Sequence, residues 1–190
     1  LYPLGQQWLP ADAYRSAMVK QMSPRPLMTF DDEQTTWIRG SNNAKAASSA
    51  RSESPGSKGT GQALALDIRD LSGWDTFEAD FPSDQAIESN AWLTFRARGD
   101  ARTHQLSIEL REHDGSRWIA VVSLSDQWQD FALPPEAFKY WRDNSAPNRG
   151  GTADRVSLAR AAAVCVGLAF THTTGVGDGD HRIWIDDLGW

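Results

Sequence analysis

The sequence contains a single cysteine, Cys165, among 190 residues, so no disulfide can form within the chain. A chain of this length with 40% hydrophobic residues can bury a core that folds without a covalent or metal staple. Cys165 lies in the apolar run 161–170, where a thiol is usually a small buried hydrophobe and rarely a nucleophile. The compartment stays open, because domains of this size also exist outside the cell without disulfides.

Basic residues are the minority, since 19 Lys and Arg stand against 25 Asp and Glu and give a formal net charge of −6. A general affinity for nucleic acid or for an anionic membrane needs a broad basic surface, so neither is expected as a partner. The sequence also has no apolar stretch long enough to span a bilayer and no signal-peptide pattern at its start. Because the chain begins at Leu1, we expect it to be a processed or excised part of a longer protein.

Several catalytic motifs are missing as well. Gly56, Gly59 and Gly61 lack the lysine and following helix of a phosphate loop, and no Gly-x-Ser-x-Gly elbow occurs. Glycoside hydrolysis needs two carboxylates flanking the scissile bond, but Glu78 and Glu109 are single acids on different predicted strands. We therefore expect the chain not to be an enzyme.

Tryptophan is abundant, with nine residues of this type. An indole offers a flat apolar face and an N–H donor, which suits a ligand that is half apolar and half wet, such as a sugar ring. We expect about half of the tryptophans to be buried in or at the ends of the core. A sugar-binding surface would depend on those that point outward.

Alternation of apolar and polar residues predicts half-buried strands from residue 62 onward. The expected inward-facing sets are Leu64, Leu66 and Ile68; Phe77, Ala79 and Phe81; Leu93, Phe95 and Ala97; and Leu106, Ile108 and Leu110. Asp114-Gly115 predicts a hairpin turn, and further strands are expected at 129–133 and 182–188. The chain is thus predicted to be all-β, an antiparallel β-sandwich or jelly roll with little helix.

Other segments give weaker signals. Residues 1–26 form a predicted N-terminal arm, with a helix over 10–22, and residues 27–190 form the predicted jelly-roll domain. The Ser-, Ala- and Gly-rich stretch 40–61 is either a long loop or a weak edge strand. The segment 156–172 reads as one long strand or as a short helix followed by a strand, and we divide it near Ala162.

Four short phrases occur in a characteristic order. They are Thr29-Phe30-Asp31-Asp32 followed by Trp37, Gly61-Gln62-Ala63-Leu64-Ala65-Leu66, Leu71-Ser72-Gly73-Trp74-Asp75-Thr76-Phe77, and Ile183-Trp184-Ile185-Asp186-Asp187-Leu188. This order resembles the galactose-binding-like jelly rolls that serve as non-catalytic carbohydrate-binding modules of bacterial polysaccharide-degrading enzymes, with family 11 and its relatives as the nearest comparison. The resemblance covers residues 27–190.

The resemblance implies a structural calcium where the first and last strands approach each other. The matching acids are Asp31, Asp32, Asp186 and Asp187. Calcium takes six to eight oxygen ligands, which these carboxylates and the carbonyls of a Gly- and Ser-rich loop can supply. The alternative is that the aspartates only cap strand ends in water.

The strand alternation also predicts a binding face. If Leu93 and Leu106 face the core, the outward residues of their two strands would share one outer surface. The candidate carbohydrate-binding residues are Trp92, Arg96, Arg98, Glu109, Arg111, Trp118 and His172. The strand of Trp118 can be read in either parity, and His172 would lie at the rim of a trough left by Gly167 and Ala169. An ordinary solvated face with Arg–Glu pairs is the alternative.

The resemblance implies a carbohydrate-binding module that holds a covalently linked glycan-degrading domain near polysaccharide, outside the cell or in the periplasm. The arginines of the predicted face further suggest a ligand with carboxylates or sulfates. A second hypothesis is a structural jelly roll that braces a neighbouring catalytic domain without binding sugar. A jelly-roll lyase or hydrolase is the third and least favoured.

Overall fold

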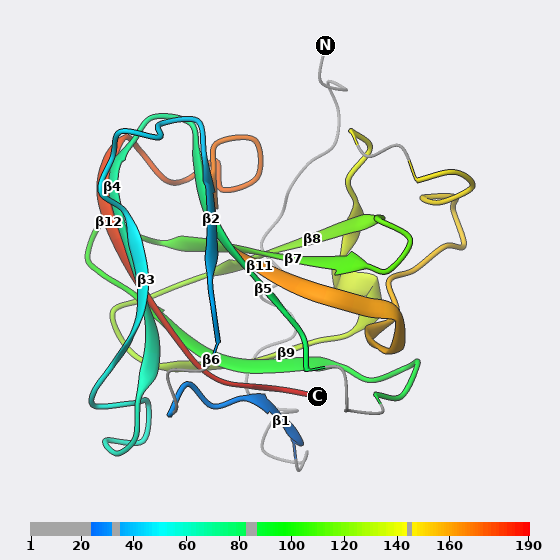
Figure 1. Cartoon of the computed structure of the whole chain (residues 1–190), viewed down its shortest axis with the longest axis horizontal. Coiled ribbons are helices and arrows are strands. Elements are labelled where there is room, and N and C mark those ends of the chain that lie inside the picture. The colour runs from blue at the N-terminus through cyan, green and yellow to red at the C-terminus, as the bar shows by residue number, and fades with distance from the viewer. Residues whose placement is uncertain (1–23, 32–34, 83–86, 144–145) are drawn as a thin grey trace.

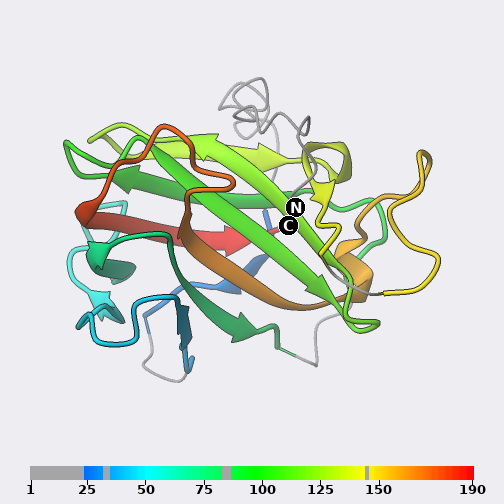
Figure 2. The same ribbon diagram turned by 90° about the horizontal axis from the view of Figure 1, so that it is seen from above.

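The computed structural model of the chain describes residues 24–31, 35–82, 87–143 and 146–190. They form two antiparallel sheets stacked as a sandwich (Figures 1 and 2). Sheet A has the order β3-β4-β12-β6-β9, with β1 also paired to β12. Sheet B has the order β10-β8-β7-β11-β5-β2. The prediction of an antiparallel β-sandwich is confirmed.

Most strands are short, and the three longest are β12, β4 and β11. Sheet A consists of β1 (Pro26–Met28), β3 (Ser49–Glu53), β4 (Ala63–Leu71), β6 (Leu93–Gly99), β9 (Gln129–Leu133) and β12 (Gly179–Gly189). Sheet B consists of β2 (Ile38–Ser41), β5 (Trp74–Asp80), β7 (Gln105–Glu112), β8 (Arg117–Ser123), β10 (Lys139–Tyr140) and β11 (Ala161–Ala169). Two 3-10 turns, η3 (Pro135–Ala137) and η4 (Leu158–Arg160), complete the elements.

The core lies between the sheets and follows the alternation of the sequence. The predicted inward-facing residues are all buried, and Phe95 and Phe131 stack at 4.9 Å between ring centroids. A fully buried side chain of this size contributes about 1.5–3 kcal/mol through removal of apolar surface from water. This shared interior holds the two sheets together.

Several local predictions can now be compared with the structure. Asp114-Gly115 forms the turn between β7 and β8, where Gly115 has a φ of 84°. The segment 40–61 contains β3 and the end of β2, which are edge strands of different sheets. The segment 156–172 divides into η4 followed by β11, as expected. The predicted helix at 10–22 lies outside the described residues.

The prediction that the strands of Leu93 and Leu106 are neighbours is wrong. β6 pairs with β12 and β9 in sheet A, whereas β7 pairs with β8 and β11 in sheet B. The connection 100–104 crosses from one layer to the other. The backbone turns closely at its start, where a Cβ on Gly99 would lie 2.1 Å from the Thr103 carbonyl oxygen. Alternation identifies the buried face of a strand but not the sheet to which it belongs, so the two outward faces lie on opposite sides of the molecule.

The two ends of the described domain lie side by side. Arg25 and Trp190 exchange backbone hydrogen bonds of 2.8 and 3.0 Å, next to the pairing of β1 with β12.

In the described residues, no helix has the length and apolar character needed to cross a bilayer.

Candidate functional site: a cleft on sheet B

Strand β11 forms the floor of a trough on the outer face of sheet B. Val164, Val166 and Leu168 point into the core, so the alternate positions point outward. These outward positions carry only small side chains, namely Ala163, Cys165, Gly167 and Ala169. Longer side chains of the flanking strands β5 and β7 stand on either side of them.

The trough opens into a cavity of about 430 Å3, which we call the sheet B cleft. Its lining residues are Asn42, Gly73, Trp74, Thr76, Ser107, Glu109, Arg117, Trp141, Cys165, Ala169, Phe170, Thr171 and His172. The cleft combines aromatic walls with hydroxyl, carboxylate and guanidinium groups. This is the mixture of apolar surface and directional polar groups that a small ligand site needs.

Trp74 is the exposed aromatic of the cleft, with 43% of its surface accessible. A Cβ on Gly40 of the neighbouring β2 would lie 2.9 Å from Trp74 Cζ3, so the indole rests directly against this glycine. The Trp74 backbone N–H donates to Asn42 Oδ1 at 2.7 Å, which fixes the start of β5. The indole is therefore held in place by the edge strand before any ligand arrives.

Trp141 and His172 form a second aromatic element of the cleft. Their rings meet edge to face, with centroids 4.6 Å apart and an interplanar angle of 88°. Burial of the imidazole, followed by the positive charge of Arg117, lowers the pKa of His172 to about 4. His172 is therefore neutral at neutral pH and lines the cleft as predicted from the trough.

Glu109 and Arg117 place a fixed ion pair in the cleft. Arg117 Nε and Nη2 donate to the two carboxylate oxygens of Glu109 at 2.5 and 2.7 Å. The hydrogen bonds that Arg117 donates to Glu109 raise the pKa of Arg117 above its usual value, against the opposing effect of burial. Desolvation and the nearby Glu109 raise the pKa of Cys165 to about 12, so its thiol stays protonated.

The predicted binding residues do not form one surface. Glu109 and His172 line the cleft, and Arg111 lies beside it, paired with Glu78 at 2.8 Å. Arg96 and Arg98 belong to β6 and Trp92 directly precedes it, so these residues are on sheet A.

Trp118 is only 2% exposed and faces the core, because the β7–β8 register places it opposite the inward Leu110. It packs edge-on against Tyr140 and beneath the Arg149 guanidinium, so it cannot serve as a surface platform.

Three of the predicted calcium ligands line one hollow of about 590 Å3, namely Asp31, Asp186 and Asp187. Asp32 lies outside the described residues. Thr60 O, Gln62 O and Asp186 Oδ2 all lie close to Gly56, each within 3.0 Å of the position that a Cβ would take there, so the three oxygens are neighbours. This hard-oxygen donor set suits calcium.

Other contacts already engage these aspartates. The Ser57 N–H donates to Asp186 Oδ2 at 2.7 Å, and Lys58 Nζ lies 2.9 Å from Asp187 Oδ2. Within the described ranges, no group of three or more His, Cys, Asp or Glu side chains is arranged to hold a metal. A calcium in this hollow would have to draw on backbone carbonyls, and Lys58 would compete with it for Asp187.

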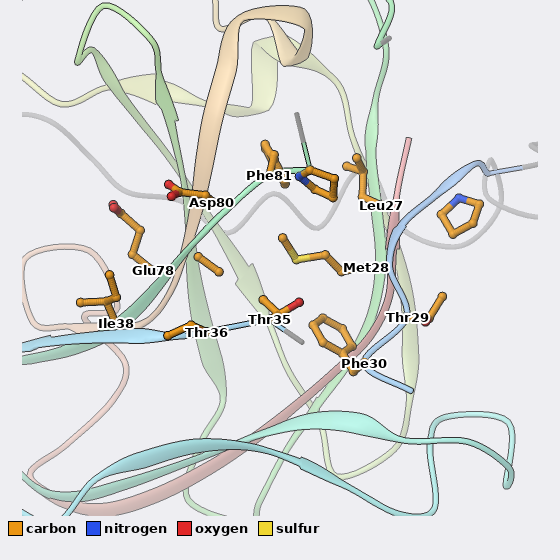
Figure 3. A pocket seen from close by; sticks show the side chains of 13 residues that line it. Leu27, Met28, Thr29, Phe30, Thr35, Thr36, Ile38, Glu78, Asp80 and Phe81 are labelled. Atoms are coloured by element: carbon orange, nitrogen blue, oxygen red, sulfur yellow. The ribbon is translucent and has the colours of Figure 1, made fainter. Parts of the chain in front are cut away.

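A larger hollow of about 640 Å3 lies between β1 and the end of β5. Figure 3 shows Met28 between Leu27 and Phe30, with the carboxylates of Glu78 and Asp80 pointing away from it. Its walls are mainly the outer rim of the core, and none of the described residues that line it is a tryptophan. Its aromatic side chains, Phe30 and Phe81, are buried, whereas the sheet B cleft has the exposed indole of Trp74.

No family model and no curated protein matches the chain. A family 11 carbohydrate-binding module from Clostridium thermocellum, in complex with a β-1,3-1,4-mixed-linked tetrasaccharide, superposes with a TM-score of 0.63 at 13% identity, covering 86% of this chain and 92% of that one. The family 11 module of the cellulosomal cellulase Lic26A-Cel5E of the same organism gives a TM-score of 0.58 at 12% identity, with coverages of 88% and 93%.

An exo-β-agarase gives a TM-score of 0.57 at 13% identity. The matched region covers 88% of this chain but only 25% of the agarase. At such identities the likeness establishes the fold, and the chain has the β-sandwich architecture of these carbohydrate-binding modules. The resemblance predicted from the four sequence phrases is confirmed at that level.

Proposed function

We propose that the chain is a non-catalytic carbohydrate-binding module that holds a polysaccharide segment in the sheet B cleft. The observation that carries the proposal is Trp74, an exposed indole held against Gly40 at the side of a polar trough. The C–H face of a pyranose would stack on the indole, and its hydroxyls would exchange hydrogen bonds with Ser107 and Glu109. The fold shared with carbohydrate-binding modules supports this function.

The charges of the cleft favour a neutral glycan. Arg117 is bound by Glu109, and Arg111 beside the cleft is bound by Glu78 and Asp80. A guanidinium already held by a carboxylate has little attraction left for a uronate or a sulfate. The paired groups can still exchange hydrogen bonds with sugar hydroxyls, so at this site the acidic ligand suggested by the arginine count is disfavoured.

The module would act by proximity. Tethering raises the effective concentration of an attached glycan-degrading domain on its polymer. The agarase match supports such an arrangement, because the matched region is about a quarter of that longer enzyme. We propose an extracellular or periplasmic location, since polysaccharide substrates are found there. The brace hypothesis remains the second candidate.

A structural calcium is part of the proposal. Asp31, Asp186 and Asp187 would hold it together with the carbonyls of Thr60 and Gln62, whereas Asp32, the fourth predicted ligand, lies outside the described residues. The ion would stabilise the folded chain by binding it and not the unfolded chain. Melting in calcium and in EDTA tests this, because equal melting temperatures at low salt would contradict a bound ion.

Affinity electrophoresis in gels containing neutral β-glucans, agarose-derived polymers and other neutral polysaccharides tests the binding function. We expect retardation by at least one polymer and a loss of about tenfold or more in affinity for Trp74→Ala, because the stacking surface is removed. Ile38→Ala is the matched control, since Ile38 is an exposed apolar residue of the same sheet that lines the hollow of Figure 3 instead.

Each result has a defined meaning. If Ile38→Ala abolishes retardation and Trp74→Ala leaves it intact, the polymer binds in the hollow of Figure 3 and not in the sheet B cleft. Trp92→Ala should bind like the unmodified chain, because Trp92 lies next to β6 of sheet A. Absence of retardation by every polymer would favour the brace.

A further inference from the structure

The outer face of sheet A carries an arginine between two tryptophans. Trp184 of β12 lies opposite Arg98 of β6, and Trp128 immediately precedes β9 on the other side of β6. The guanidinium carbon of Arg98 lies 3.9 Å from the ring centroid of Trp184 and 5.4 Å from that of Trp128. Both indoles are half-buried, so part of each is open to solvent. We call this group the Arg98 ladder.

The neighbouring arginines of this face all have carboxylate partners. Arg96 Nε lies 2.9 Å from Asp130 Oδ1, and Arg182 Nε lies 3.1 Å from Asp67 Oδ1. Arg51 also pairs with Asp67.

Arg98 differs from these neighbours. Among the described residues no carboxylate pairs with Arg98, whereas its buried Nε makes no hydrogen bond, as is also true of Arg96 Nε and Arg182 Nε. The ladder is thus a fixed cation whose positive charge the protein does not neutralise.

The stacking determines which part of the guanidinium can bind a ligand. Indole rings attract the planar faces of a guanidinium, which leaves its N–H donors in the plane between the rings. Nε is buried, so a ligand acceptor would reach the guanidinium through its terminal Nη groups, for which the described residues supply no hydrogen-bond acceptor. Carboxylate and sulfate match the spacing of these donors and accept two parallel hydrogen bonds.

We infer that the Arg98 ladder is a second glycan site, which takes the carboxylate or sulfate of an acidic sugar on the face opposite the sheet B cleft. Trp184 is already in contact with both Arg98 and Arg182, so the half-buried Trp128 would supply the apolar surface for the sugar ring beside its oxyanion. The inference takes the ligand class from the proposed function but uses different residues, a different sheet and a different ligand charge.

Affinity electrophoresis at low salt in gels containing polygalacturonate, κ-carrageenan or a mixed-linkage β-glucan tests the site. We expect at least one acidic polymer to retard the chain. Retardation by polygalacturonate would indicate a uronate ligand and retardation by κ-carrageenan a sulfate ligand. Added salt should weaken the retardation in either case. Arg98→Gln should lose about tenfold or more in affinity for the acidic polymer. The affinity of Arg98→Lys should lie between those of Arg98→Gln and the unmodified chain, because lysine keeps the charge but not the paired donors. Trp74→Ala should leave this binding unchanged.

Four outcomes would overturn the inference. They are no retardation of the unmodified chain by either acidic polymer, equal retardation of Arg98→Gln and the unmodified chain, loss of acidic binding in Trp74→Ala, and retardation by polyglutamate as strong as by the glycans. Thermal melting identifies a variant that fails to fold, in which case Arg98→Lys supplies the comparison. Failure of the cleft proposal is separate, since it concerns the neutral glucan and Trp74→Ala.

Discussion

Acidification should destabilise the fold through His172. The imidazole is 7% exposed, and its native pKa is about 4, whereas a histidine in an unfolded chain titrates near 6.5. Between these values the unfolded state binds a proton that the native state does not, so stability falls as pH falls from about 6.5 toward about 4. The gap corresponds to about 3 kcal/mol, fully present above about pH 6.5 and lost by about pH 4.

Urea unfolding at a series of pH values measures this contribution. Carboxylates titrate over the same range, so the informative quantity is the difference between the unmodified chain and His172→Gln, which cannot gain that proton. We expect the unmodified chain to lose about 3 kcal/mol more than the variant between about pH 7 and about pH 4. His104→Gln is the matched control, because His104 is exposed, and it should behave like the unmodified chain. Parallel pH profiles for the unmodified chain and His172→Gln would refute the reasoning.

Two other substitutions test the cleft and the framework. Gly40→Ala should push the Trp74 ring from its place and weaken the affinity for glycan by about tenfold. Gly177→Ala is the control and should bind normally, because a Cβ there meets nothing within 4 Å. Equal binding by both variants would contradict the role of Trp74 as a stacking platform. Arg149→Gln should lower the free energy of unfolding by on the order of 3 kcal/mol, because it removes a partner of the fully buried Glu112. Unchanged urea midpoints for Arg149→Gln would show that Glu112 is satisfied without it.

The strands could be predicted where burial is one-sided. β4, β6 and β7 alternate because one face of each meets the core, and the Asp114-Gly115 turn could be read directly. β2 and β3 gave little signal, since as edge strands they have no fully buried residue. The pairing of strands was not accessible, because alternation contains no information on which sheet a strand joins.

The site was predicted in part. The small residues of β11 and the position of His172 followed from parity along one strand. Trp74 was missed as a platform, although the same parity argument applied to β5 turns it outward, away from the inward Phe77. Arg117 and Trp141 required the register of β7 with β8 and the course of a loop, neither of which is written in local periodicity.

The floor of the sheet B cleft is a single strand, and this makes its depth adjustable. Val164, Val166 and Leu168 belong to the core, while the intervening side chains determine how far a ligand can descend. A library at Cys165 and Ala169, which line the cleft, could therefore reshape the groove without repacking the interior. Gly167 should stay fixed, since its φ is 153° and a Cβ there would lie 2.4 Å from the Asp75 carbonyl oxygen. Two positions on one strand would then be the starting point for redirecting the module toward a bulkier or a flatter polymer.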